Sequence, residues 1–345
     1  MIQDFDFPRH FLYSFYPDNF FTSFDAAGKT IMLKKQMMIV MVSACVCVLL
    51  ACGAKEIQRQ PRHQQAAENE LVEGNTWYMR GCYNKASDYF EKALERFSAC
   101  DNLEGVAKSM NNLGSLHRAS KELDSALMFF DESFRLFKRI NLPLGQVQAL
   151  SNKAAVYMDM DQLAQAESVL DQADTLALKN AIIYPPLLSN RALLLIRQAK
   201  TREAETLLSQ ALIQTSAAKA FEYATINHAM GLLMETRGDN DRAITYYTTA
   251  LDTDRNSYFI RGIAADLSAL GRVYLAMGQN DDAADALYRG LKIQTLVGDA
   301  DAAEKTSVLL KRCLEAMGEK TPDMRITDHF LTQWANGDIV SGPCD

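Results

Sequence analysis

Few side chains in this sequence stand at spacings that could support catalysis or metal binding. The acidic segments GDND (238–241) and GQNDD (278–282) lack the alternating ligands and the terminal glutamate of a calcium-binding loop. The histidines show no metal-ligand spacing, and the sequence has no HExxH, GxSxG or phosphate-binding glycine loop. We therefore predict no enzyme activity, no metal site and no cofactor. A hydrolase with an unrecognised motif is the alternative, and it would need polar groups that converge in one pocket.

Residues 32–52, MLKKQMMIVMVSACVCVLLAC, have the order of a secretion signal. Lys34 and Lys35 form a positive start, and 37–51 is an uncharged apolar run too short to span a bilayer comfortably. The run ends in LLAC, which resembles the bacterial lipobox. That resemblance implies that the signal peptide (32–51) is removed and that Cys52 carries lipid. The alternative is an ordinary signal peptide, or a membrane anchor with an incidental cysteine.

The flanks of this signal bear on localisation. Gly53 follows Cys52, whereas an Asp there retains lipoproteins of enteric bacteria in the inner membrane, so the resemblance implies an outer-membrane lipoprotein facing the periplasm. Two acyl chains would give a durable anchor, and the polar residues 52–66 are predicted to form a flexible tether.

Residues 1–31 do not have the composition of a signal peptide, and we interpret them as a misassigned extension before a start at Met32. The sequence does not decide whether the chain starts at Met1 or at Met32. It also does not decide whether the lipoprotein lies in the inner or the outer membrane.

Four cysteines would remain in the mature chain, in a compartment that permits disulfides. Cys82 and Cys100 lie at opposite ends of one predicted helix, roughly 25 Å apart, so we expect no bond between them. A bond between Cys313 and Cys344 would require the tail to fold back. The pairing of these cysteines stays open at this point.

Charge and composition narrow the class of protein. The formal net charge is −7 and no basic stripe is present, which argues against a nucleic-acid-binding protein. Hydrophobic residues make up 48% and charged residues 23% of the chain, as in soluble globular proteins. Only eight prolines are present, which suits helices.

A repeat with fixed internal spacing predicts the fold. A small residue recurs every 38 to 40 positions, an alanine follows twelve residues later, and a large apolar residue comes four after that. The small residues are Gly74, Gly114, Ala154, Ala192, Gly231 and Gly271. The alanines are Ala86, Ala126, Ala166, Ala204, Ala243 and Ala283, and the large residues are Phe90, Phe130, Leu170, Leu208, Tyr247 and Leu287. The offset of four places the alanine and the large residue on one face of a second helix, so each repeat is a closely packed helix pair.

These positions resemble the tetratricopeptide repeat (TPR), in the long-period subclass found in kinesin light chains and related adaptors. The aromatic residue that this repeat carries three positions after the small residue stands here as Trp77, Tyr157 and Tyr274. The resemblance implies an all-α fold, an α-solenoid of about six TPR helix-turn-helix repeats. We place the array at 67–300, a C-terminal capping helix at 301–318 and a loose tail at 319–345.

Turn residues separate the predicted helices of several repeats. Gly81, Gly238 and Gly278 stand between the two helices of a pair. The candidate N-caps of the second helices are Asn84, Asp124, Asp241 and Asp281.

The resemblance also implies a concave groove lined by the first helix of each pair. Asparagines recur there as Asn112, Asn152 and Asn190, with Asn75 and Asn111 nearby. An amide both donates and accepts hydrogen bonds, so such a ladder can pair with the backbone of an extended peptide. The alternative is that these asparagines only meet water. Three arginines should face the same groove and could receive acidic groups: Arg118, Arg197 and Arg272.

We therefore predict a membrane-anchored scaffold or adaptor of the bacterial cell envelope that binds a protein or peptide in its groove. We expect neither nucleic acid nor a small-molecule substrate as a partner. The alternative is an assembly lipoprotein, such as a pilotin for a pilus secretin or an accessory subunit of outer-membrane protein insertion. The sequence selects no partner, pathway or oligomeric state.

Overall fold

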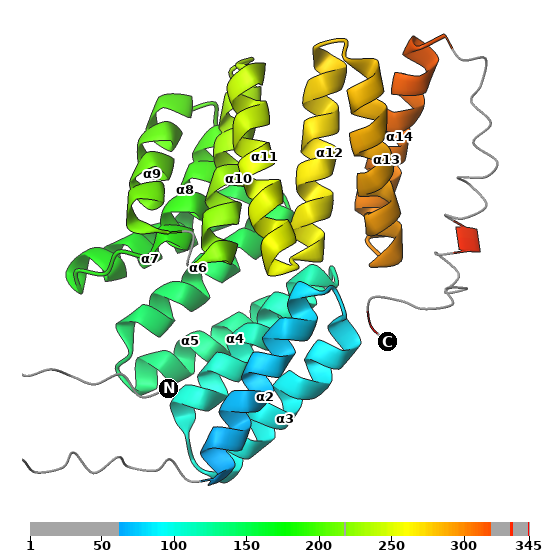
Figure 1. The fold of residues 1–345 in the computed structure, drawn as a ribbon. Coiled ribbons are helices and arrows are strands. Elements are labelled where there is room, and N and C mark those ends of the chain that lie inside the picture. Colours follow the sequence, from blue (N-terminus) through cyan, green and yellow to red (C-terminus); the bar gives the residue numbers. More distant parts are fainter. Residues whose placement is uncertain (1–61, 217–218, 319–331, 334–343, 345) are drawn as a thin grey trace, which may run out of the picture. The chain divides into compact units, whose positions relative to one another are not determined.

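The computed structural model describes residues 62–216, 219–318, 332–333 and 344, and these residues form thirteen helices and no strand (Figure 1). The first helices of the pairs are α2 (Arg62–Met79), α4 (Leu103–Ala119), α6 (Pro143–Asp159), α8 (Pro185–Arg197), α10 (Ala220–Thr236) and α12 (Ile260–Ala276). The second helices are α3 (Tyr83–Ala99), α5 (Leu123–Arg139), α7 (Leu163–Lys179), α9 (Thr201–Gln214), α11 (Asn240–Ser257) and α13 (Asn280–Leu296). The last helix is α14 (Ala300–Ala316). The predicted all-α array of about six helix pairs with a capping helix is confirmed.

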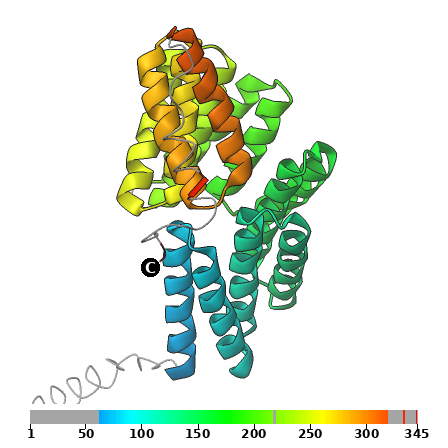
Figure 2. The same cartoon turned by 90° about the vertical axis from the view of Figure 1, so that its right-hand side faces the viewer.

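Stacking builds the array in two ways. Each helix packs on the next one along the chain, and each first helix also contacts the first helix of the following pair. Figures 1 and 2 show α12, α13 and α14 side by side at the end of the array. Because no pair buries its apolar face alone, stability depends on neighbouring pairs.

The repeated small and large residues form the interior of each pair. All six alanines of the repeat are fully buried, at 0% exposure, and so are the six large residues, at 1% or less. The small residue of the first helix makes room for the large one of the second. A Cβ atom on Gly114 would lie 2.7 Å from the Phe130 ring, and one on Gly231 would lie 2.6 Å from the Tyr247 ring. The predicted close approach of the two helices through small side chains is therefore present.

The turns agree with the sequence, whereas the predicted N-caps are wrong by two residues. Gly81, Gly238 and Gly278 all have positive φ, between +74° and +77°. The N-cap residue comes directly after each turn, as in α11, where the Asp239 side chain accepts from the Arg242 N–H at 3.3 Å. The four predicted caps, Asn84, Asp124, Asp241 and Asp281, occupy the second position of their helices instead. The three carboxylates there still face the positive end of the helix dipole.

The cysteine pairing, which the sequence leaves open, does not join Cys313 to Cys344. Cys344 forms a disulfide with Cys82, 262 residues away, while Cys100 and Cys313 are free. Cys313 is fully buried between α13 and α14, and its thiol donates to the Asn280 carbonyl at 3.0 Å. The Cys313 thiol is therefore engaged within this core, and Cys344 pairs elsewhere. The expectation that Cys82 and Cys100 do not pair agrees with the structure.

Several predicted segments lie outside the described residues. They include the extension 1–31, the signal 32–51, Cys52 and most of the tail. Helix α2 begins at Arg62, so it includes 62–66, the end of the predicted tether. None of the helices in the described part is long and apolar enough to cross a bilayer.

Candidate binding groove

The first helices surround one cavity of about 600 Å³. Every first helix contributes to its lining, and the second helices contribute only Phe90 and Phe130. Five of the predicted groove residues lie in this lining: Asn75, Asn112, Arg118, Asn152 and Asn190. The structure thus brings together side chains from four repeats that the sequence had linked only by their spacing.

Two predicted groove residues, Arg197 and Arg272, do not line the cavity. The cavity crosses the helices obliquely. It is lined by the C-terminal halves of α2 and α4, but by the N-terminal ends of α8, α10 and α12. Arg197 ends α8 and Arg272 belongs to the C-terminal half of α12, so both lie too far along their helices. The spacing of the repeats does not indicate that the cavity shifts from the C-terminal halves of the early first helices to the N-terminal ends of the later ones.

The asparagines bond to one another or to the neighbouring first helix. The Asn112 amide donates to Asn75 Oδ1 at 3.3 Å, and the Asn152 amide donates to Asn111 Oδ1 at 3.1 Å. The Asn190 amide donates to the backbone oxygen of Ser151 at 3.0 Å and to its hydroxyl at 2.9 Å. These bonds hold successive first helices in register and fix the orientation of the amides.

The three predicted arginines are paired within the chain. The Arg118 guanidinium binds both carboxylate oxygens of Asp159, with Nε 2.7 Å from Oδ2. Arg197 donates to the backbone oxygen of Met158 at 2.7 Å. The Arg272 guanidinium binds both carboxylate oxygens of Glu235 at 3.0 and 2.9 Å. Each pair joins consecutive first helices, so these arginines fasten the array, and their role as receptors for acidic groups stays a prediction.

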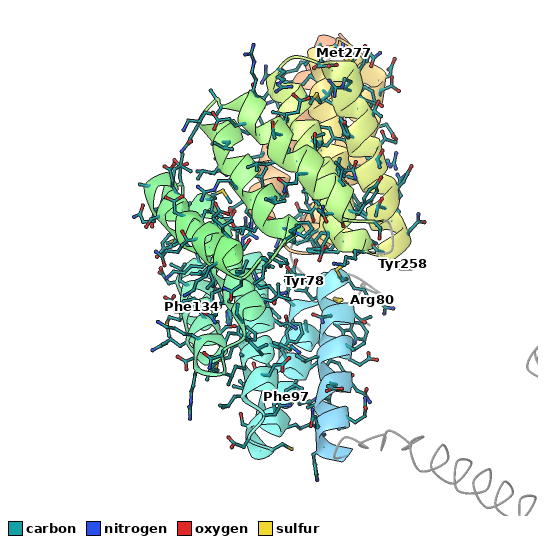
Figure 3. All side chains as sticks on the ribbon, turned by 90° about the vertical axis from the view of Figure 1, so that its left-hand side faces the viewer. Tyr78, Arg80, Phe97, Phe134, Tyr258 and Met277 are labelled. Atoms are coloured by element: carbon teal, nitrogen blue, oxygen red, sulfur yellow. A yellow bond between two sulfur atoms is a disulfide. The ribbon has the colours of Figure 1, made fainter. Side chains whose placement is uncertain are left out.

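An aromatic end of the cavity was not predicted. Tyr78 comes from the C-terminal end of α2 (Figure 3), and Tyr184, Phe221 and Phe259 precede or begin α8, α10 and α12. The Phe221 and Phe259 rings meet edge to face with centroids 5.0 Å apart. Burial raises the pKa of Tyr184, and the carboxylate of Glu222 adds to the effect, so this phenol stays neutral. These residues stand at no common repeat position, so only the excess of aromatic residues at helix starts could have indicated them.

The lining suits non-covalent binding. Among the residues that the structure describes, no histidine or cysteine lines the cavity, and its serine, Ser115, donates to the Asn111 carbonyl at 3.1 Å. The described residues hold no group of three or more side chains that could bind a metal ion. The polar groups are spread along the cavity as amides and paired charges. They do not converge as a nucleophile and a base would.

A second hollow, of about 820 Å³, lies between α5, α6 and α7. Its apolar floor includes Phe134, Leu150 and Leu176, and its rim carries two lysines and two carboxylates. This hollow is the larger one, but it involves only three consecutive helices. We take the cavity of the first helices as the candidate site because all six repeats build it.

Comparison with known proteins agrees with this architecture. The family model of the tetratricopeptide repeat matches residues 74–139 and 222–296. The chain contains tetratricopeptide repeats. Repeats of this kind generally mediate interactions between proteins and bind peptides. No curated protein matches the sequence.

Two solved structures share the tetratricopeptide fold over most of the chain. A chain of the Cut9–Hcn1 hetero-tetramer of the APC/C is 15% identical with a TM-score of 0.51, and the match covers 79% of this chain and 53% of that one. The present chain therefore spans about half the length of that relative. The Rap conjugation gene regulator of plasmid pLS20, in complex with the Phr* peptide, is 17% identical with a TM-score of 0.53, and 80% of each chain is covered. At these identities the likeness shows the fold alone.

Proposed function

We propose that this tetratricopeptide-repeat chain holds an extended segment of a partner protein in the cavity of its first helices, as a lipid-anchored scaffold of a bacterial cell envelope. The observation that carries the proposal is the continuity of this cavity. One hollow runs past all six first helices, with an amide ladder along its floor and an aromatic end.

The amides retain hydrogen-bonding capacity for a peptide backbone. Within the described residues, Asn75 accepts a bond but donates none, so its two N–H groups remain available. Asn152 and Asn190 donate but accept no bond from another described residue, so their carbonyl oxygens remain available. An extended peptide offers N–H and C=O groups in alternation, which matches this set of donors and acceptors.

The aromatic end suits an apolar side chain of the same segment. Phe221 is 44% exposed although it is a large apolar residue, and it lines the cavity beside Phe259. Covering exposed aromatic surface is a favourable contribution to binding. The volume of about 600 Å³ lies within the usual range of ligand pockets, so it accommodates a few residues of a peptide. The pLS20 regulator, which has a similar fold, was solved with a peptide bound.

The anchor rests on residues 32–52 and is tested separately. We expect a lipid label fed to a bacterial host to enter the wild-type chain and to be absent from Cys52→Ser, which should leave the membrane fraction. Cys47→Ser, a change within the signal, is the matched control and should retain the label. Labelling of the Cys52→Ser chain would contradict the lipoprotein assignment.

The groove is tested by site-specific photocrosslinking in the native membrane. We place a photoreactive amino acid at Thr225, which lines the cavity, and at Thr206 on the second helix α9 as the matched control. Both are exposed helical threonines whose hydroxyls bond only to the carbonyl four residues earlier, so either replacement should be tolerated.

We expect a discrete crosslinked polypeptide from Thr225 and none from Thr206. Mass spectrometry of the adduct then identifies the partner segment. Equal capture at both positions, or no polypeptide at Thr225, would contradict the proposal.

A further inference from the structure

The larger hollow, between α5, α6 and α7, lies on the other side of α6 from the cavity of the first helices. Gln146 and Leu150 line the hollow, whereas Asn152 and Asp159 of the same helix line the cavity. Because an α-helix turns by roughly 100° per residue, these two pairs point to opposite sides of α6. A molecule bound in the hollow would therefore leave the cavity free.

The spacing of two second helices creates this hollow. Helices α5 and α7 both pack on α6, but they share no extended packing with each other in the described part of the chain. The floor between them is apolar and comprises Phe134 (Figure 3), Leu150 and Leu176. The lining residues of α7 run from Ala164 to Lys179, a length of about 22 Å at 1.5 Å per residue. A groove of this length fits a helix of about fifteen residues.

One polar side chain lies in this floor without a partner. Gln146 is only 8% exposed, and its amide forms no hydrogen bond with another side chain or backbone group of the described residues. An unpaired amide in a buried place costs free energy, so a group that bonds to it is favoured. The floor is therefore suited to an occupant that is mainly apolar and carries one polar side chain.

Two lysines at one end of the hollow also lack a partner. Lys138 and Lys179 belong to the last turns of α5 and α7, which run in the same direction because a short turn joins each of them to α6. Neither lysine forms an ion pair with a described residue. The two carboxylates of the rim, Asp171 and Glu167, already accept bonds from side chains of α8 at 2.7 and 3.3 Å. The free charge of the rim is thus positive on a chain whose net charge is −7, and it is complementary to acidic groups.

This lining fits a helix better than an extended peptide. The apolar floor offers few groups that could pair with the N–H and C=O groups of an extended backbone, whereas a helix bonds its own backbone groups and presents an apolar face. The first turn of a helix favours acidic side chains, because the helix dipole is positive there. An acidic first turn beside Lys138 and Lys179 brings opposite charges together, and it places the bound helix antiparallel to α5 and α7.

We propose that the hollow between α5, α6 and α7 is a second docking site, which takes an amphipathic helix of a partner protein. The apolar face of that helix covers the floor, and one polar side chain in this face bonds to the Gln146 amide. Its acidic first turn pairs with Lys138 and Lys179. The docking site does not depend on the proposed function of the cavity, so the chain can hold two partner segments at once.

Two synthetic peptides test the site on the purified full chain. Both are stapled helices of about fifteen residues with leucines at i, i+4 and i+7. The acid-first peptide has two glutamates in its first turn and two lysines in its last turn, and the lysine-first peptide has these charges exchanged. We expect the acid-first peptide to bind at a ratio of one to one, at least tenfold more tightly in calorimetric titration. Because the staple keeps both peptides helical, the difference reports the charges of the site.

Reversing the charge of the two lysines should reverse this preference. The double variant Lys138→Glu with Lys179→Glu should bind the lysine-first peptide more tightly, and circular dichroism checks that it folds. The matched control is Lys305→Glu with Lys311→Glu, which changes two exposed lysines of α14 and should keep the preference of the wild type. Equal affinity of the wild type for both peptides would overturn the proposal, as would an unchanged preference in the folded Lys138→Glu, Lys179→Glu variant.

Photocrosslinking locates the bound peptide without changing the lysines. A photoreactive amino acid replaces Gln172, which is exposed and lines the hollow. Gln210 on α9 stands at the same repeat position, is also exposed and lines neither the hollow nor the cavity, so it is the control. We expect the acid-first peptide to crosslink at Gln172 and not at Gln210. Equal crosslinking at both positions would overturn the proposal, and so would a crosslink from Gln172 to a second copy of the chain in the absence of peptide.

Discussion

Single positions in the helix pairs tolerate only small side chains. Ala166 on α7 is fully buried, whereas Ala164 on the same helix is exposed. We expect Ala166→Val to lower the free energy of unfolding by about 1–3 kcal/mol, because two extra methyl groups have no space. Ala164→Val should cost about 0.6 kcal/mol through helix propensity alone. Urea unfolding followed by circular dichroism measures both, and equal losses would mean that Ala166 does not lie in a close-packed contact.

A buried carboxyl group makes stability depend on pH. Burial, with Asp266 nearby, raises the pKa of Asp254 from 3.8 to about 8. Between these values the folded chain keeps a proton that the unfolded chain has lost. The free energy of unfolding should therefore fall as the pH rises from about 4 to about 8. The loss amounts to about 1.4 kcal/mol for each unit by which the pKa is raised.

Asp254→Asn should remove this pH dependence, because the amide stays neutral at every pH. Asp252, exposed on the same helix, is the matched control. Urea midpoints at pH 5 and pH 8 should differ less in Asp254→Asn than in the wild type or in Asp252→Asn. An unchanged difference would show that Asp254 is ionised in the folded chain.

At the scale of the element, each helix is stabilised by its neighbours. Leu310 on α14 is 2% exposed and packs with Leu287 and Leu291 of α13, whereas Val308 is 54% exposed. We expect Leu310→Ala to cost about 2–4 kcal/mol and Val308→Ala less than about 0.5 kcal/mol. Hydrogen exchange should speed up in α12 to α14 and stay unchanged in α4 to α7, because an array transmits stability mainly to nearest neighbours. Equal loss of protection in α4 to α7 would argue for one cooperative unit.

The helices and their turns also show which features can be predicted from the sequence. The helix pairs followed from the sequence because their register depends on local offsets, which place Ala126, Phe130 and their equivalents on one face. The N-caps were misplaced because the turn is completed by one residue of positive φ, and the cap follows it at once. The asparagines of the cavity followed from a repeated position. The aromatic end did not, because Tyr78 and Phe259 occupy different positions in their repeats.

At the scale of the whole molecule, contacts between distant repeats carry no periodic signal. Arg261 and Ala119 are 142 residues apart, and Cys82 and Cys344 are 262 apart. Neither contact follows from helix register, because Arg261 lies several repeats from Ala119 and Cys344 lies beyond the last helix. The sequence therefore left the pairing of Cys344 open and did not indicate the oblique course of the cavity, which excludes Arg197 and Arg272.

Arg261, at the start of α12, bonds to the end of α4 and to the N-cap of α14, and this link should contribute measurably to stability. Arg261→Gln removes the bonds to Ala119 and Asp299, and we expect a loss of about 2–4 kcal/mol because the side chain is largely buried. Arg255→Gln is the control, since Arg255 is more exposed and forms only an ion pair with Asp252 in the same helix. Urea unfolding of the oxidised chains measures both. A loss for Arg261→Gln no larger than for Arg255→Gln would show that the bonds of Arg261 contribute little.

Calorimetric titration of the captured segment tests the central claim most directly. The segment identified at Thr225 is made as a synthetic peptide and titrated into the wild type, Asn152→Ala and Thr206→Ala. We expect saturable binding at a ratio of one to one, at least tenfold weaker for Asn152→Ala, which corresponds to about 1.4 kcal/mol. Thr206→Ala, on the second helix α9, should bind like the wild type. Equal affinity for Asn152→Ala and the wild type, with both chains equally stable, would contradict binding in the cavity of the first helices.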